Sequence, residues 1–288
     1  MENKLLNLLI SLDICTDDSI YQFYPKVRDR DDISVMRCKK SGVIFLSCCD
    51  HAGISHYENI REYKDWTPFD QDQVKADDLR RAEEIRNLIR KRKWLDVGCG
   101  KGGLLKILSQ EPEDSCAVEP QKNLRTRLKE EGFRVYPAID EVPDENFDFI
   151  TLFHVFEHMA DPVGALKSLH RKLSPAGKII IEVPHANDFL ISTFNLKSFK
   201  DFTFFSEHLI LHTKKSLHAF LSCAGYSNIR ITGCQRYPFS NHLYWILKNG
   251  PGGHRKWPFL QNNLLNTAYA SFLRTLSKTD TLIATAHK

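Results

Sequence analysis

The sequence contains no apolar stretch that approaches the roughly 18 residues needed to cross a bilayer as a helix. Its opening also lacks the layout of a secretory signal, because Glu2, Lys4 and Asp13 interrupt the apolar residues and no small-residue cleavage site follows. We therefore expect a cytoplasmic chain without a membrane span. In that reducing compartment the eight cysteines should be buried thiols or metal ligands, not a disulfide framework.

A strong excess of charge of one sign is absent as well. The 288 residues carry 40 basic and 36 acidic side chains, and the 42% hydrophobic content is ordinary for a globular protein. The positive excess lies in the tail, because six basic residues and one acid follow from Asn241 onward. A nucleic-acid binder normally shows a denser basic stripe. Nucleic acid is therefore disfavoured as a partner, with an RNA-modifying enzyme kept as an alternative.

From residue 76 onward, helical and strand patterns alternate along the chain. Amphipathic helices are expected over 76–89, 101–110, 122–131, 162–173 and 214–223. Short buried strands are expected over 94–97, 116–119, 133–136, 147–152, 178–183, 229–234 and 281–286. Strands separated by helices indicate an α/β fold with a parallel, doubly wound sheet. Residues 1–75 show only weak periodicity and are expected to form a small N-terminal appendage to a domain over 76–288.

The most informative segment is 94–103, Trp-Leu-Asp-Val-Gly-Cys-Gly-Lys-Gly-Gly, where a predicted strand runs into closely spaced glycines. Glycines permit positive φ there and let a ligand approach the exposed N–H groups of a helix start. The spacing fits a dinucleotide loop, with Glu119 at the distance of a ribose-binding acid. Asp96 favours S-adenosylmethionine instead, because a carboxylate repels a pyrophosphate but attracts an amino group and a sulfonium. A nicotinamide-dependent oxidoreductase is the alternative.

Four motifs in order over residues 94–183 resemble those of the class I S-adenosylmethionine-dependent methyltransferases. The first is an acid followed by spaced glycines, at Asp96, Gly98, Gly100 and Gly102. The others are Glu119 at the end of the second strand, the segment 147–162, and the approach to the fifth strand over 173–178. The resemblance implies a Rossmann-like, seven-stranded methyltransferase sheet with S-adenosyl-L-methionine as the cofactor.

The resemblance also implies where the cofactor lies. Asp96 and the glycine loop should meet its methionine part, and Glu119 should accept hydrogen bonds from the two ribose hydroxyls. Ile139 and Asp140 should lie beside the adenine. The complete set of expected cofactor-binding residues is Asp96, Gly98, Cys99, Gly100, Gly102, Glu119, Pro120, Ile139, Asp140 and Phe153.

Two histidines are candidates for a catalytic base. His154 follows the fourth predicted strand, at the edge where open α/β sheets bind ligands, and a histidine can take a hydroxyl proton near neutral pH. His208 lies in the next candidate loop. The alternative for His154 is a purely structural role in shaping the pocket. Glu157 and His158 resemble the Glu-His pair of ubiquinone-type methyltransferases and are expected to order the loop.

The acceptor is expected to be a small molecule, with phosphorylated and nucleotide-linked compounds among the candidates. The chain lacks the Asn/Asp-Pro-Pro-aromatic motif of enzymes that methylate nucleic-acid amino groups, and it lacks the carboxylate cluster of metal-dependent catechol-type relatives. Its tail over 235–254 is similar to those of nucleotide-sugar and surface-polysaccharide methyltransferases. We expect metal-free O-methylation of an activated sugar or glycan precursor, with a non-catalytic binding module as a further alternative. The expected acceptor-binding residues are His158, His185, Phe205, Arg236, Asn241 and His242.

Six of the eighteen phenylalanines lie between residues 189 and 205. Such a concentration predicts an apolar lid over the acceptor pocket, formed by residues 189–213, that keeps water from the transfer. The alternative is an ordinary buried helical face.

The N-terminal segment resembles a zinc ribbon that has lost half of its ligands. Related enzymes often begin with two Cys-x-x-Cys pairs, whereas here only Cys15 and Cys38 remain and Asp18 and Ser41 take the second positions. Two thiolates cannot close a four-ligand structural site. The nearby Cys48, Cys49, His51 and His56 are irregularly spaced. No metal is expected, and the segment is interpreted as a packing or substrate-binding cap.

Overall fold

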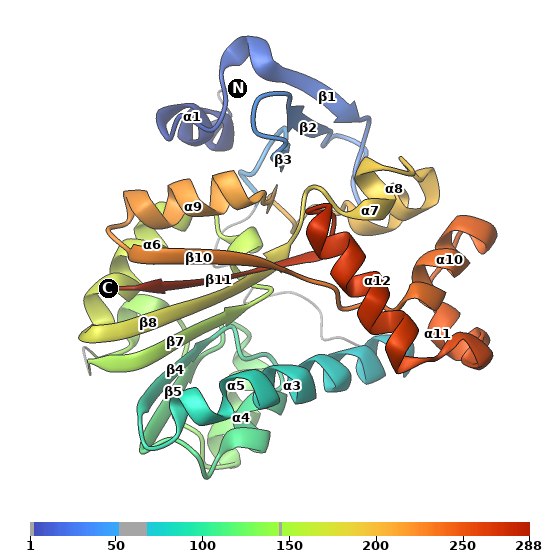
Figure 1. Cartoon of the computed structure of the whole chain (residues 1–288). Helices are drawn as coiled ribbons and strands as arrows, with labels where there is room; N and C mark the ends of the chain where they lie inside the picture. The colour runs from blue at the N-terminus through green and yellow to red at the C-terminus, as the bar shows by residue number, and fades with distance from the viewer. Residues whose placement is uncertain (1–2, 52–67, 144–145) are drawn as a thin grey trace.

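The computed structural model describes residues 3–51, 68–143 and 146–288. His56, one of the residues considered for a metal site, lies outside these ranges. The described residues form two sheets (Figure 1). The larger sheet has seven strands in the order β10-β11-β8-β7-β4-β5-β6. Their bounds are β4 (Lys93–Val97), β5 (Asp114–Val118), β6 (Val135–Tyr136), β7 (Phe147–Phe153), β8 (Leu173–Pro184), β10 (Ser227–Cys234) and β11 (Thr281–His287). All seven expected strands are therefore present, in a Rossmann-like arrangement.

One strand departs from the expected parallel sheet. β11 runs antiparallel to both of its neighbours, β8 and β10. The reason is that residues 235–280 leave the sheet and return at the same edge, where Thr281 pairs with Cys234. A chain that re-enters beside its point of exit must run back along the strand that it has just left. The remaining five strands, from β8 to β6, are all parallel.

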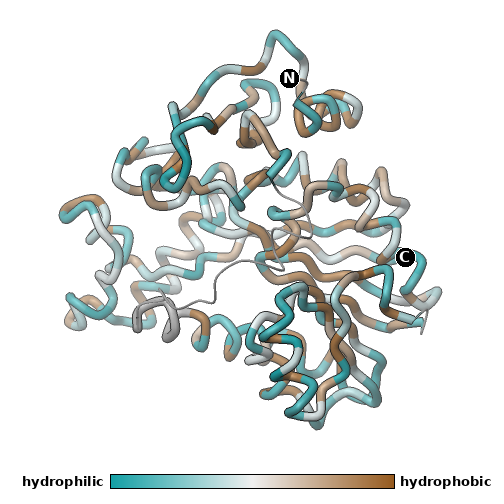
Figure 2. The backbone as a smooth tube through the Cα atoms, turned by 180° about the vertical axis from the view of Figure 1, so that it is seen from behind, coloured by the Kyte–Doolittle hydropathy of each residue, from teal (hydrophilic) through white to brown (hydrophobic). Residues whose placement is uncertain are grey.

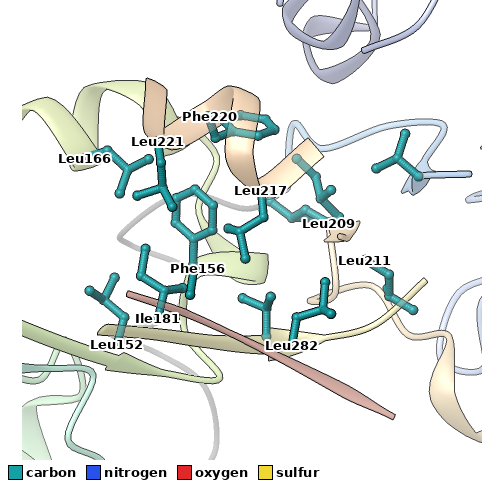
Figure 3. Close-up of a cluster of buried hydrophobic side chains, with 14 of the residues drawn as sticks. Leu152, Phe156, Leu166, Ile181, Leu209, Leu211, Leu217, Phe220, Leu221 and Leu282 are labelled. Atoms are coloured by element: carbon teal, nitrogen blue, oxygen red, sulfur yellow. The ribbon is translucent and has the colours of Figure 1, made fainter. Parts of the chain in front are cut away.

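Helices cover both faces of the larger sheet because its strands are apolar on both sides. Along β4, Trp94 packs with α3 (Pro68–Ile89), α4 (Gly103–Leu108) and α5 (Lys122–Glu130), whereas Leu95 belongs to the opposite core. That second core lies under α6 (Pro162–Lys172) and α9 (Lys214–Cys223). Figure 3 shows its side chains, with Leu152, Ile181 and Leu282 of the sheet facing Leu217 and its neighbours on α9.

The N-terminal appendage is a small antiparallel sheet, and its fourth strand, β9, comes from the main domain. Its order is β1 (Ile20–Tyr24), β2 (Val35–Cys38), β3 (Ile44–Leu46) and β9 (Ile210–Leu211), and α1 (Lys4–Ser11) precedes it. In Figure 1 it sits above the α9 face of the larger sheet. Because β9 follows the aromatic segment, the appendage is tied directly to the loops that surround the candidate acceptor site.

Two regions that the sequence pattern left irregular are helical. The aromatic segment contains α7 (Phe189–Ser192) and α8 (Lys197–Thr203). Residues 235–280, here called the C-terminal insertion, contain α10 (Phe239–Lys248), α11 (Gly253–Lys256), the short turn η4 (Pro258–Leu260) and α12 (Asn263–Thr275). Figure 2 shows the backbone from behind, with hydrophobic and hydrophilic residues alternating along much of the chain. Among the described helices, none combines the length and apolar character required to cross a membrane.

Candidate functional site

The glycine loop that follows β4 packs against the segment that follows β7. Gly98, Gly100 and Gly102 all have positive φ, at 74°, 56° and 71°. A Cβ on Gly98 would lie 2.3 Å from a methyl carbon of Val155, so a larger residue cannot occupy this position without moving that loop. No atom lies within 4 Å of the corresponding position on Gly100. The loop therefore has one side closed by Val155 and another side open to a ligand.

Asp96 and Glu119 lie at the ends of neighbouring parallel strands, and both are buried. Asp96 accepts a hydrogen bond of 2.7 Å from the hydroxyl of Thr151, and Glu119 accepts bonds of 2.8 Å from the N–H groups of Gly100 and Gln121. Burial raises the pKa of Asp96 to about 7 and also raises the pKa of Glu119. These carboxylates have acceptor capacity left for the amino and hydroxyl groups of a ligand.

The other expected cofactor residues surround this point less uniformly. Cys99 and Pro120 are half-buried beside the loop, and Ile139 packs against the core from the turn η2 (Ile139–Glu141). The Asp140 carboxylate accepts a hydrogen bond from Ser168 on α6, so it is directed to a structural contact in this structure. The ring of Phe153 lies 4.9 Å from the Arg81 guanidinium.

His154 begins a tight turn at the end of β7, where its φ is 56°. Its Nδ1 lies 3.0 Å from a carboxylate oxygen of Glu157, and its Nε2 lies 2.7 Å from Nη1 of Arg236. A guanidinium can only donate, so Nε2 accepts this bond and the proton of a neutral imidazole lies on Nδ1, directed at Glu157. Arg236 comes from the C-terminal insertion, far from His154 in the sequence.

A buried charged network supports this histidine, and the sequence reading did not anticipate it. Glu182 on β8 is fully buried and accepts hydrogen bonds from Arg80 and Arg81 of α3, with its oxygen 3.3 Å from Nε2 of His154. Asp77, also on α3, forms a bidentate ion pair with Arg236. Glu182 could have been noticed as an acid inside the apolar run of β8. The α3 residues carry no such signal, because charged residues are ordinary on a helix surface.

The network holds its acids in the ionised form. Burial alone would raise the pKa of Glu157, but the hydrogen bond from His154 and the nearby imidazoles outweigh it and lower the pKa to about 2. Likewise Arg236 overcomes the effect of burial on Asp77, whose pKa falls to about 2. For Glu182 the opposing burial is outweighed by the positive charges of Arg81 and Arg236, and its pKa lies well below the usual value. Positive charge is thus already supplied on this side of the site.

His208, the second candidate for the base, lies in a group with Phe205, His158 and Glu157. The ring centroid of His208 is 4.0 Å from that of Phe205 and 5.1 Å from that of His158. Burial, and secondly the charge of His158, lower the pKa of His208 to about 3, so this imidazole is neutral. Ligand atoms of Glu157, His158 and His208 all lie within 4.8 Å of one another. Among the described residues, this is the group that could place three side chains around one metal ion.

Three of the expected acceptor-binding residues are buried and engaged in structural contacts. Nδ1 of His185 bonds to the carbonyl of Thr279, and burial lowers its pKa to about 4. The Asn241 side chain accepts from the N–H groups of Gly252 and Gly253, and His242 bonds to the hydroxyl of Tyr269 on α12. The structure therefore brings His154 and His158 to Glu157, with Arg236 against His154 and Phe205 against His158. The other three expected residues, Asn241, His185 and His242, are buried.

The phenylalanines of residues 189–205 do not form one face. Phe204 is buried against Phe23 and Tyr24 of the N-terminal sheet, and Phe199 packs on Trp245 of α10. Phe205 contacts the histidine group described above. The segment consequently joins three parts of the molecule, namely the appendage, the C-terminal insertion and the candidate acceptor site.

Cys15 and Cys38 of the appendage are buried together. The Cys38 sulfur lies 3.2 Å from the hydroxyl of Ser19 and accepts from the N–H of Ser41 at 3.4 Å. Burial raises the pKa of Cys15 to about 12, whereas hydrogen bonds from Ser19 and Ser41 overcome burial and lower that of Cys38 to about 7. Ser41, which takes the second position of the Cys38 pair, thus contacts the sulfur through its backbone N–H.

The chain is similar to known proteins at the level of a family, of individual relatives and of solved structures. Residues 69–231, more than half of the chain, match the family described as a methyltransferase domain. The matched region includes the glycine loop, Glu119, the β7 end and the aromatic segment.

Individual relatives and structures are more distant. The ubiquinone biosynthesis O-methyltransferase of Pseudomonas aeruginosa is 28% identical over 107 residues, which are 33% of this chain and 46% of that enzyme. A SAM-dependent methyltransferase structure from Archaeoglobus fulgidus has a TM-score of 0.53 at 20% identity, covering 76% of this chain and 94% of that one. A second, from Thermotoga maritima, has a TM-score of 0.53 at 16% identity and covers 82% and 100%. The chain spans less than half the length of the first relative, and the two structures support the fold.

Proposed function

This chain belongs to the class I S-adenosylmethionine-dependent methyltransferases, and from that premise we propose that it methylates a hydroxyl oxygen of a small, anionic acceptor. The acceptor class that fits best is a phosphorylated or nucleotide-linked sugar or glycan precursor. The observation that carries the proposal is the hydrogen bond between Nη1 of Arg236 and Nε2 of His154. It brings an anion-binding group and a proton acceptor to one point beside the glycine loop.

The cofactor is S-adenosylmethionine, and the residues at the β4 and β5 ends fit it. Among the described residues, neither the Asp96 nor the Glu119 carboxylate is hydrogen-bonded to a cationic side chain, although both are buried. When bound, the cofactor supplies an electrophilic methyl group on a positively charged sulfur. We assign Asp96 to the side of its charged methionine part and Glu119 to its ribose hydroxyls, with the open face of Gly100 allowing close approach.

On the acceptor side, His154 is proposed to take the hydroxyl proton at Nε2. In the structure Arg236 occupies that nitrogen, so proton transfer requires this hydrogen bond to be released. An anionic group on the acceptor that pairs with Arg236 would release it, whereas a neutral acceptor would not compete for the guanidinium. This exchange supports a phosphorylated acceptor over a neutral one.

The first test is a screen for S-adenosylhomocysteine formation with separate pools of sugar phosphates, nucleotide sugars, quinol precursors and tRNA. We expect turnover with a phosphorylated sugar pool and none with its dephosphorylated counterpart. Turnover only with quinol precursors, or only with tRNA, would contradict the proposed acceptor class while leaving the methyltransferase assignment intact.

The second test separates the two halves of the site. His154→Ala should reduce turnover at least a hundredfold, as expected for the loss of a general base, and should leave cofactor affinity unchanged. Asp96→Ala or Glu119→Ala should weaken cofactor binding about ten- to a hundredfold, because each removes a hydrogen bond to a charged or polar donor. His218→Ala, a change at an exposed histidine on α9, is the matched control. Turnover of His154→Ala within a few-fold of the unmodified protein would move the base to His208 or remove base catalysis.

A further inference from the structure

The C-terminal insertion concentrates the exposed apolar side chains of the protein. Eleven large hydrophobic residues are exposed in the part of the chain that the structure describes, and six of these lie between residues 247 and 276. The six are Leu247, Phe259, Leu264, Leu265, Phe272 and Leu276. In Figure 1 the insertion projects beyond the edge of the larger sheet, with α12 alongside it. Monomeric proteins seldom leave such a concentration uncovered unless it binds something.

The exposed large apolar residues of α12 and its C-cap Leu276 form a stripe. At about 100° per residue, Leu264, Phe272, Leu265 and Leu276 fall within a sector of about 120° on one side of the helix. Leu264 is 81% exposed and Phe272 is 52% exposed, whereas the only buried residue that α12 contributes to the protein is Leu273. The helix is therefore amphipathic in the unusual sense that its apolar sector faces away from the core.

The charge of the insertion selects the occupant of this face. Residues 239–279 contain no acid and five basic residues, which are Lys248, Arg255, Lys256, Arg274 and Lys278. A second copy would bring the same positive charges against them, which is unfavourable. An anionic lipid surface offers both an apolar layer for the leucines and phenylalanine and negative head groups for the lysines and arginines.

We propose that the exposed face of α12 docks on an anionic membrane surface, with Lys248 and Lys256 contacting the head groups. Arg274 and Lys278 donate hydrogen bonds to Gly233 and Thr193 and add only to the overall positive charge. The attachment is peripheral, with the helix lying in the plane of the surface. The side of α12 that carries Leu273 remains packed on the protein, and Tyr269, between that side and the apolar sector, contacts Phe189 and His242. The proposal does not depend on the acceptor, because it concerns a surface that the transfer reaction does not use.

The test is sedimentation of the full chain with lipid vesicles. Vesicles of phosphatidylcholine with phosphatidylglycerol should bind the protein at least tenfold more tightly than vesicles of phosphatidylcholine alone, and the preference should shrink as salt is raised. Leu264→Ser/Phe272→Ser should lower binding to the anionic vesicles at least tenfold. The matched control is Leu79→Ser/Leu88→Ser on α3, where the two leucines are 49% and 43% exposed, and it should bind like the unmodified protein.

A charge variant, Lys248→Glu/Lys256→Glu, should abolish the preference for phosphatidylglycerol. Thermal unfolding of each variant shows whether it is folded, so a loss of binding with a normal transition supports the proposal. Equal binding by all variants, or none by the unmodified protein, overturns it. Light scattering that finds a dimer which Leu264→Ser/Phe272→Ser converts to a monomer also overturns it, in favour of a second copy.

Discussion

The two sides of the sheet's carboxyl edge bury acids in opposite ways. At the β4 and β5 ends, Asp96 and Glu119 are buried without a hydrogen bond from a cationic side chain of the described chain, and burial raises their pKa values. At the β7 and β8 ends, Glu157 and Glu182 are equally buried but are held ionised by histidine and arginine. One side of the edge therefore leaves a place for positive charge from a ligand, whereas the other already contains positive charge.

The largest expected effect comes from removing the acid at the centre of the paired side. Glu182→Ala leaves Arg80 and Arg81 without their buried carboxylate, and removing one partner of a buried ion pair costs about 3–5 kcal/mol of unfolding free energy. Urea denaturation measures the loss. The control is Glu84→Ala, because Glu84 pairs with the same Arg80 but is 43% exposed, and it should cost less than about 1 kcal/mol. Similar losses in both variants would mean that the network contributes no more than a surface pair.

A smaller effect should appear in the pH dependence of stability. The pKa of Glu157 falls from 4.5 to about 2 on folding, so its contribution is fully present above pH 4.5 and is lost as the pH falls toward 2. Between pH 6 and pH 3 the contribution of this group should decrease by about 2 kcal/mol. Denaturation of Glu157→Gln at both pH values should show a correspondingly weaker pH dependence. An unchanged slope would show that Glu157 is not held ionised by its histidines.

The unpaired side should respond to pH in a higher range, because the pKa of its acid is raised and not lowered. With the pKa of Asp96 raised to about 7, this acid is mostly protonated at pH 6, and a cationic cofactor favours its ionised form. Affinity for S-adenosylmethionine should therefore rise by up to about tenfold between pH 6 and pH 8, with release of a proton. Calorimetry in buffers of different ionisation enthalpy measures both quantities. Asp96→Asn should remove the pH dependence, and an unaltered profile in that variant would assign it to another group.

The smallest expected effect is that of metal removal. If arginine and histidine side chains neutralise the acids at the β7 and β8 ends, no metal ion is needed there. Protein purified without chelators should contain well under one zinc per chain, and treatment with EDTA should leave its melting temperature and turnover unchanged. One metal per chain that disappears in Cys15→Ser would restore a ribbon-type site in the appendage. One that disappears in His208→Ala would place it with Glu157 and His158.

The residues on the cofactor side of the edge could be predicted from the sequence, whereas most of those around His154 could not. The glycine loop, Asp96 and Glu119 could be found because each lies at a strand end and contacts residues near it in the sequence or on the adjoining strand. Two partners of His154 could not, because Arg236 reaches it from the C-terminal insertion and Glu182 from β8. Asp77 joins only through Arg236.

Two residues of the tail were expected to bind the acceptor and instead make structural contacts. Asn241 and His242 have the side chains of a polar binding site, yet in the structure they cap the turn at Gly252 and bond to Tyr269. Side-chain type alone did not distinguish a group that serves a ligand from one that satisfies buried backbone. The helices of the C-terminal insertion were missed for a related reason, since α12 turns its apolar residues outward and buries only Leu273.

The position of β11 has a consequence for the synthesis of the protein. This strand lies between β8 and β10, so both neighbours leave the ribosome before the strand that joins them exists. Until residues 281–287 are added, the nascent sheet presents two unpaired edges with a strand-wide slot between them. Such edges are templates for pairing with other chains. The polypeptide therefore carries two exposed strand edges until β11 has been synthesised, and we expect a holding chaperone to act at that stage.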